Sequence, residues 1–145
     1  GVGASLVAAQ KAADKFMRIE PKVRCVNDAH AQAMVASTLG PEDVAVVISY
    51  SGSTKDTNAV AQLAQATGAK VIAITRFHKS PLTEFTDVTL LCGANESPLQ
   101  GGSSSADISQ SFLFDLLYTE YYRKNLEKCS EINRRTSQSV LNKLY

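Results

Sequence analysis

The sequence predicts an α/β fold in which short parallel strands alternate with helices. Three apolar runs rich in β-branched residues, at residues 44–50, 70–75 and 87–92, are separated by stretches with helical periodicity. Apolar runs of this length are typical of strands buried on both faces, and their alternation with helices favours parallel βα units. With 145 residues the chain is long enough to bury a core, so we expect residues 1–145 to form one domain.

The strands differ in their expected places in the sheet. The run VAVVISY at residues 44–50 is the strongest candidate and is expected at the centre, with KVIAIT at 70–75 and DVTLLC at 87–92 beside it. KVRCV at 22–26 alternates polar and apolar residues, which predicts a strand nearer an edge. A glycine turn opens the chain at residues 1–5, and because such a turn normally follows a strand, a further strand is expected before it.

Helices are predicted between and after these strands. Ala, Val, Leu or Met recur at steps of three and four residues over residues 5–18, 29–37 and 56–67. A long helical pattern runs from residue 107 to about 126, and a last helix is expected over roughly 131–144. The apolar residues of this last helix are sparse, which indicates packing on a partner.

Composition excludes several classes of function. The formal net charge is +1 and the cations are spread along the chain, so no electrostatic footprint for nucleic acid is present. No apolar run approaches the roughly 20 residues of a membrane span, and no signal sequence opens the chain, which predicts a soluble protein. Cys25, Cys92 and Cys129 show no paired spacing, which favours the cytoplasm, with Cys25 and Cys92 as core residues. The two histidines lie outside metal-ligand spacing, so no metal or other cofactor is expected.

A hydroxyl-rich loop follows the strongest strand and directly precedes a helix, where ligands bind in open α/β sheets. Its Ser and Thr hydroxyls, a glycine that permits close approach and the free N–H groups of the next helix make a cradle for phosphate. The pattern GxxxxGK[ST] is absent, which favours reversible binding of a monoester over a nucleoside triphosphate. The alternative is that one hydroxyl only caps the helix. The loop consists of Ser49, Tyr50, Ser51, Gly52, Ser53 and Thr54.

Other loops are candidates for completing a pocket. At the first glycine turn Leu6 replaces the third glycine of GxGxxG, which disfavours a dinucleotide site, and Ser5 is expected to project into the same crevice as the hydroxyl-rich loop. Glu96 follows the third strand, where a carboxylate can bind sugar hydroxyls or act as a general base. Ser103 and Ser104 precede the long helix.

Together these motifs resemble the SIS (sugar isomerase) domain, a phosphosugar-binding family. Residues 1–5 resemble its first loop and residues 47–54 its phosphate loop. The resemblance implies a three-layer αβα sandwich, flavodoxin- or Rossmann-like, around a five-stranded parallel sheet whose first strand is truncated here. It also implies phosphate binding by Ser49, Ser51 and Thr54, a loop shaped by Gly52 and Ser53, and a sugar pocket completed by Ser5, Glu96, Ser103 and Ser104.

Within the family, residues 16–19 and 114–118 resemble the effector domain of RpiR-type bacterial transcription regulators. This resemblance implies that the chain senses a phosphorylated sugar, while DNA is read by a separate N-terminal domain that is absent here. Many such regulators have a basic residue where this chain has Ser105-Ala-Asp107. A homodimer or higher homo-oligomer is expected, because the helix at residues 108–122 offers more apolar surface than one sheet face needs.

Two alternatives remain open from the sequence. An aldose-ketose phosphosugar isomerase needs both a base and an acid, and Glu96 supplies the base, but no well-placed His or Lys joins it. His78, beyond the end of the second strand, is either a ligand contact or part of a solvated loop. A purely structural dimerisation domain is the other alternative.

Overall fold

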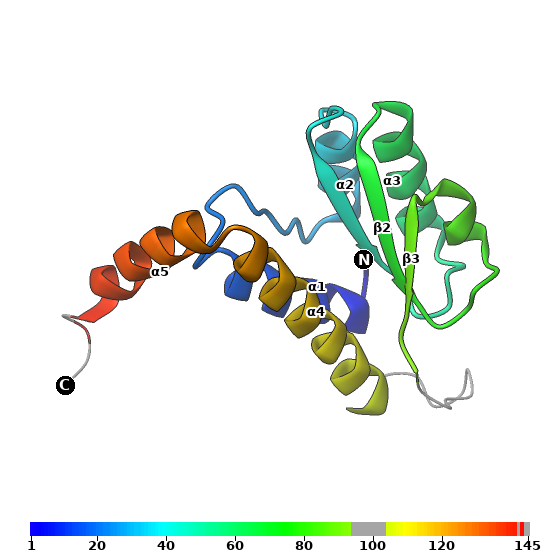
Figure 1. Ribbon diagram of the computed structural model, residues 1–145. Helices are drawn as coiled ribbons and strands as arrows, with labels where there is room; N and C mark the ends of the chain where they lie inside the picture. Colours follow the sequence, from blue (N-terminus) through cyan, green and yellow to red (C-terminus); the bar gives the residue numbers. More distant parts are fainter. Residues whose placement is uncertain (94–103, 142, 144–145) are drawn as a thin grey trace.

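The computed structural model describes residues 1–93, 104–141 and 143, and it confirms the predicted alternation of strands and helices (Figure 1). None of the helices in these described residues is long and apolar enough to cross a membrane. In chain order the elements are α1 (Ala4–Phe16), α2 (Ala29–Ala36), β1 (Val44–Ile48), α3 (Lys55–Ala66), β2 (Lys70–Thr75), the 3-10 helix η1 (Pro81–Phe85), β3 (Val88–Leu91), α4 (Ser104–Lys124) and α5 (Leu126–Leu141).

The sheet is parallel, with β2 between β1 and β3. The expectation that residues 44–50 form the central strand is therefore wrong for the described sheet, where β1 lies at an edge and its Val44 and Val46 are exposed. Val44 pairs with Lys70 at one end of the β1–β2 ladder, and Ile48 pairs with Ile74 at the other. The carboxyl ends of the strands therefore lie at one edge, where the loops that follow them gather. The described residues form three strands, so the five-stranded sheet implied by the family resemblance is not what this chain shows.

The edge strand predicted at residues 22–26 is wrong. This segment is irregular and pairs with no strand in the described part of the chain. The carbonyl of Val26 accepts a hydrogen bond of 2.8 Å from the side-chain amide of Gln32, a helical residue, in place of a ladder partner. Alternating polarity is a weak strand signal, because a strand also needs a neighbour to receive its backbone hydrogen bonds.

Two apolar clusters lie on opposite faces of the sheet, which gives a three-layer arrangement. Successive strand residues point to opposite faces, so Val47 and Ile48 belong to different clusters. One face packs on α2, α3 and η1, the other on α1 and α4 (Figure 1). The buried members of the first cluster are Ala36, Val47, Ala61, Ala64, Val71, Ala73 and Leu82. Those of the second are Ala12, Ile48, Ile74, Cys92 and Phe114. Cys92 thus lies in the core as predicted, whereas Cys25 is only half-buried.

The helices α1 and α4 are joined along their length by polar and aromatic contacts. Lys11 Nζ lies 2.8 Å from an Asp107 carboxylate oxygen, and Lys15 Nζ lies 2.5 Å from Asp115. Directly after Lys15, the ring of Phe16 meets that of Tyr118 edge to face, with centroids 5.4 Å apart. Exposed ion pairs contribute little individually, so the aromatic contact and the shared core hold the two helices together.

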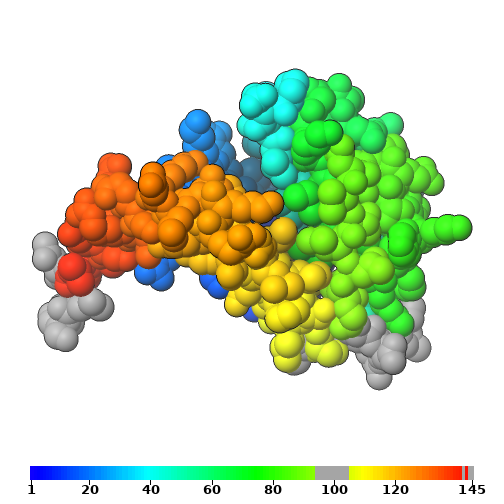
Figure 2. Space-filling model, viewed as in Figure 1, coloured from blue at the N-terminus to red at the C-terminus, as the bar shows by residue number. Residues whose placement is uncertain are grey.

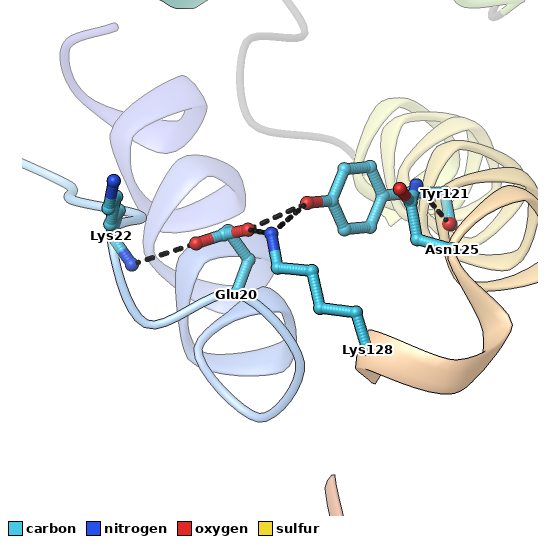
Figure 3. A network of polar contacts seen from close by, with 5 residues as sticks. All are labelled: Glu20, Lys22, Tyr121, Asn125 and Lys128. Carbon is cyan, nitrogen blue, oxygen red and sulfur yellow. Dashed lines mark hydrogen bonds and ion pairs between the residues drawn. The ribbon is translucent and has the colours of Figure 1, made fainter. Parts of the chain in front are cut away.

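The last helix, α5, projects beyond the body of the molecule (Figures 1 and 2). A polar network ties its first turn to the segment after α1 (Figure 3). Glu20 Oε2 accepts hydrogen bonds from the Tyr121 hydroxyl at 2.6 Å and from Lys128 Nζ at 2.5 Å. These bonds lower the pKa of Glu20 and raise the pKa values of Tyr121 and Lys128. Further along, the Thr136 hydroxyl donates to the carbonyl of Arg18 at 3.0 Å.

Candidate ligand-binding site

The hydroxyl-rich loop lies at the carboxyl end of β1, as its sequence predicts. Ser49 continues the ladder, because its N–H donates to the carbonyl of Ile74 at 3.1 Å. This bond fixes the buried Ser49, whose hydroxyl donates to Thr54 Oγ1 at 3.3 Å. The first and last residues of the loop are therefore joined across its mouth.

A tight turn connects these two ends. The Gly52 N–H donates to the carbonyl of Ser49 at 3.1 Å, and Gly52 has a φ of 65°, in the left-handed region that favours glycine. The Ser53 N–H donates to Ser51 Oγ at 3.2 Å. Ser51 and Ser53 are exposed, so their hydroxyls lie at the surface of the loop, where a ligand can reach them.

Thr54 occupies the N-cap position of α3 without capping the helix. Its side chain makes no hydrogen bond to the first amides of α3 and accepts instead from Ser49. The interpretation that a loop hydroxyl merely caps the helix is therefore not supported at Thr54. The amides at the start of α3, together with the positive end of the helix dipole, are suited to an anion.

The first glycine turn lies beside this loop. Gly3 has a φ of 59° and forms the N-cap of α1, again with no side-chain cap. Gly1 packs so closely on the end of β1 that a Cβ at this position would lie 2.8 Å from the carbonyl oxygen of Ile48. Ser5, which is half-buried, occupies the first turn of α1 at this same edge of the sheet. Two uncapped helix starts thus meet near the carboxyl end of β1.

Backbone contacts from the turn after β2 complete the support of the loop. The carbonyl of Tyr50 accepts from the Arg76 N–H at 3.0 Å and from the Thr75 hydroxyl at 3.3 Å. The carbonyl of Gly52 accepts from the Leu82 N–H at 3.0 Å. Sequence reasoning missed these residues, since no local pattern shows that the β2–η1 turn returns to the loop.

The side chains of three predicted site residues lie outside the described part of the structure. Glu96 and Ser103 lie outside the described residues. Ser104 is the first residue of α4, but its side chain is likewise outside the description. Asp107, from which the sequence predicts the long helix to run, lies in the first turn of α4 and pairs with Lys11. His78 is exposed on the turn after β2.

The charged groups around the loop are few. Lys55 and Asp56 are exposed in the first turn of α3, and the Arg76 guanidinium carbon lies 5.9 Å from the centre of the Tyr50 ring. Within the described ranges, no three His, Cys, Asp or Glu side chains are grouped to hold a metal ion. The described part of the candidate site is therefore built from hydroxyls, amides and two helix starts.

A separate hollow of about 600 Å³ lies between α1 and residues 23–27. It contains none of the predicted site residues. Burial raises the pKa of Cys25, one of its lining residues, which disfavours a reactive thiolate there. The other polar and charged lining residues are Gln10, Asp14, Arg24 and Asn27.

Comparison with curated proteins finds relatives among transcription regulators. An uncharacterized HTH-type transcriptional regulator from Clostridium perfringens is 35% identical over 142 residues, covering 98% of this chain and 51% of the relative. The HTH-type transcriptional regulator RpiR from Escherichia coli K12 is 34% identical over 141 residues, covering 97% and 47%. The chain thus spans about half the length of these relatives.

Solved structures and a family model also match this chain. The NanR protein of Vibrio vulnificus, solved in complex with ManNAc-6P, gives a TM-score of 0.92 at 29% identity, over 99% of this chain and 54% of that one. The sugar isomerase domain of an RpiR transcription factor from Sphaerobacter thermophilus gives 0.81 at 19% identity, over 95% and 75%, which shows a shared fold. The family model described as SIS domain matches residues 1–120. With most of its length inside that match and its loops arranged as described above, this chain belongs to the SIS domain family.

Proposed function

We propose that this chain is the effector-sensing domain of a transcription regulator and that it binds a phosphorylated sugar at residues 49–54. The observation that carries the proposal is the geometry of Thr54. Its hydroxyl accepts from Ser49 and leaves the start of α3 without a side-chain cap, so amides and hydroxyls converge where a phosphate would sit. Similarity to HTH-type transcriptional regulators supports the sensing role, and similarity to the NanR protein, which was solved with ManNAc-6P, supports a sugar phosphate as the ligand.

Each residue of the site has a proposed role. Ser49, Ser51 and Thr54 bind the phosphate, while Gly52 and Ser53 shape the turn and Tyr50 anchors it through its carbonyl. The sugar is proposed to contact Ser5 from the neighbouring helix start and to be enclosed by Glu96, Ser103 and Ser104.

DNA binding is proposed to belong to another part of the parent protein. A net charge of +1, with the cations spread along the chain, does not suit DNA, so we assign DNA binding to a separate domain of the parent protein. A cytoplasmic location follows from that role.

Substitution of two phosphate-loop hydroxyls tests the site. Ser51→Ala combined with Thr54→Ala should weaken binding of N-acetylmannosamine 6-phosphate at least tenfold, because hydrogen bonds to a charged group contribute about 1.5–3 kcal/mol each. Isothermal titration calorimetry measures the dissociation constants. Ser139→Ala, which removes an exposed hydroxyl on α5, is the matched control and should bind like wild type. Wild-type affinity in the double variant would show that the phosphate binds elsewhere.

The isomerase alternative has its own test. The purified domain is incubated with hexose and hexosamine 6-phosphates, and aldose-ketose conversion is followed by NMR. We expect binding without turnover, because the loop's bonds in the described structure come from hydroxyls and backbone groups, with no acid-base pair among them. Turnover that disappears in Glu96→Gln would replace the sensing proposal with an enzyme.

Self-association is proposed through α4. Three exposed apolar side chains recur on one face of this helix at four-residue steps, with exposed fractions of 68% for Ile108, 62% for Phe112 and 48% for Leu116. Such a stripe can pack against the same stripe of a second copy about a two-fold axis, because the two surfaces are then identical. A homodimer is therefore the proposed assembly.

A further inference from the structure

We infer that Ser80 is the positioning residue of the phosphate loop and that it acts by packing against Gly52. Ser80 lies on the turn between β2 and η1, outside the loop itself. The inference rests on the proposed function in one respect, that residues 49–54 form the ligand site. It adds a residue on another segment that sets the shape of that site.

The turn after β2 is bonded to the phosphate loop on both sides of Ser80. Before it, the Arg76 N–H donates to the carbonyl of Tyr50 at 3.0 Å. After it, the Leu82 N–H donates to the carbonyl of Gly52 at 3.0 Å. These two bonds leave the segment little freedom to move away from the loop.

The Ser80 side chain fills the space that a side chain at position 52 would need. A Cβ built on Gly52 would lie 2.2 Å from Ser80 Oγ and 2.5 Å from Ser80 Cβ, and 3.1 Å from Thr75 Oγ1. The two separations from Ser80 are far inside van der Waals contact, while the one from Thr75 is only tight. Gly52 is also at a φ of 65°. Two independent conditions, the close approach of Ser80 and the left-handed backbone, therefore both require glycine here.

Ser80 itself is held firmly. Its N–H donates to Thr83 Oγ1 at 3.1 Å, and its carbonyl accepts from the Thr83 N–H at 3.0 Å. Leu82, two residues on, is fully buried in the cluster that includes Ala61 and Ala64 of α3. Because Ser80 is anchored to the core, a larger group between it and Gly52 would displace the turn that carries the exposed Ser51 and Ser53.

The position of Gly52 affects ligand binding through the two serines beside it. Gly52 separates Ser51 from Ser53, and the Ser53 N–H donates to Ser51 Oγ. A shift of Gly52 therefore changes the directions of both exposed hydroxyls at once. Ser80 needs no contact with the ligand to control affinity.

A double-mutant cycle tests the pair. Gly52→Ala should weaken binding of N-acetylmannosamine 6-phosphate by about 30-fold, since it adds a clash to an unfavourable backbone conformation. Adding Ser80→Gly removes the clash and should restore affinity to within about fivefold of wild type, the remainder being the cost of alanine at positive φ. Additive losses in the double variant would overturn the inference.

Ser80→Ala separates positioning from direct contact. It keeps the Cβ that lies 2.5 Å from the built position and removes only the hydroxyl, so its affinity should stay within about twofold of wild type. If Ser80→Ala weakens binding more than about tenfold, the hydroxyl binds the ligand directly and the positioning role is wrong.

A second test does not depend on the proposed function. It measures hydrogen exchange of the amides of residues 50–54 in the absence of ligand. Gly52→Ala should accelerate this exchange and Ser80→Gly should slow it again in the double variant. If Gly52→Ala does not fold, recovery of folded protein by Ser80→Gly gives the same answer, and absence of recovery contradicts the inference. If the wild type binds no sugar phosphate, the proposed function fails while the exchange data still decide the role of Ser80.

Discussion

Gln32 shows how one buried polar side chain can organise a binding edge. Its side-chain Nε2 donates to the carbonyl of Gly1 at 3.0 Å and to that of Val26 at 2.8 Å, and the residue is 8% exposed. It thereby joins the first glycine turn to the segment that precedes α2. Nothing in the sequence AHAQAMVA distinguishes this glutamine from a surface residue, because its two acceptors are remote carbonyls.

Replacement of Gln32 should therefore destabilise the fold. Gln32→Leu removes two hydrogen bonds and leaves two carbonyls unpaired, which should lower the free energy of unfolding by about 2 kcal/mol. Urea unfolding followed by circular dichroism measures the difference. Gln62→Leu, at an exposed position on α3, is the control and should change stability by less than about 0.5 kcal/mol. Equal effects of the two variants would mean that the Gln32 bonds do not contribute.

The position of the hydroxyl-rich loop was predictable because its residues are contiguous. Hydroxyls, a glycine and a following helix appear together in the sequence at residues 49–54, and the structure places that loop at the strand end as expected. The residues that hold the loop were not predictable. Ser80 and Leu82 reach it only because β2 runs beside β1, and a contact between separate segments leaves no periodic signal.

Among the secondary-structure elements, the boundary between the last two helices was also not predictable from the sequence. The last helix was predicted over 131–144, yet α5 begins at Leu126, directly after a single non-helical residue. That residue, Asn125, donates through its side-chain amide to the carbonyl of Tyr121 at 2.9 Å, which satisfies a group at the end of α4. Asparagine is a weaker break than glycine or proline, so the sequence pattern hid the boundary.

The Glu20 network should fasten α5 to the rest of the molecule. Glu20→Gln replaces the acceptor shared by Tyr121 and Lys128 with a neutral amide, so the α5 amides should exchange faster with solvent at pH 7 (Figure 3). Hydrogen exchange by mass spectrometry measures this local stability. Glu131→Gln is the control, because its partner Arg134 lies on the same helix. Unchanged exchange in Glu20→Gln would mean that apolar packing alone holds α5.

The same network predicts a pH dependence with a defined sign. Lys128 and Tyr121 lower the pKa of Glu20, so the carboxylate stabilises the attached α5 at pH values above its unfolded pKa of about 4.3. That contribution should decline as the pH falls through the lower pKa of the folded state. The difference in α5 protection between wild type and Glu20→Gln should therefore shrink below about pH 4. A difference that grows on acidification would contradict the assignment.

For the whole molecule, α1 and α4 connect the binding edge to the projecting α5. The start of α1 packs on the end of β1 through Gly1, and α5 bonds to Glu20 and Arg18 in the segment that follows α1. Because Lys11, Lys15 and Phe16 all contact α4, the two helices form one packed unit. A ligand that shifts the start of either helix would thus bias the position of α5.

The α4 stripe gives the proposed homodimer a direct test. Phe112→Glu places a charge at the centre of Ile108, Phe112 and Leu116, and desolvating that charge in an interface costs more than a dimer of this kind can supply. We expect the wild type to be a dimer at micromolar concentration by light scattering and the variant to be a monomer with an unchanged circular dichroism spectrum. Met34→Glu on α2 is the matched control, since Met34 is 60% exposed and Phe112 62%. If both charges leave the dimer intact, another face carries the assembly; if both abolish it, added charge alone explains the loss.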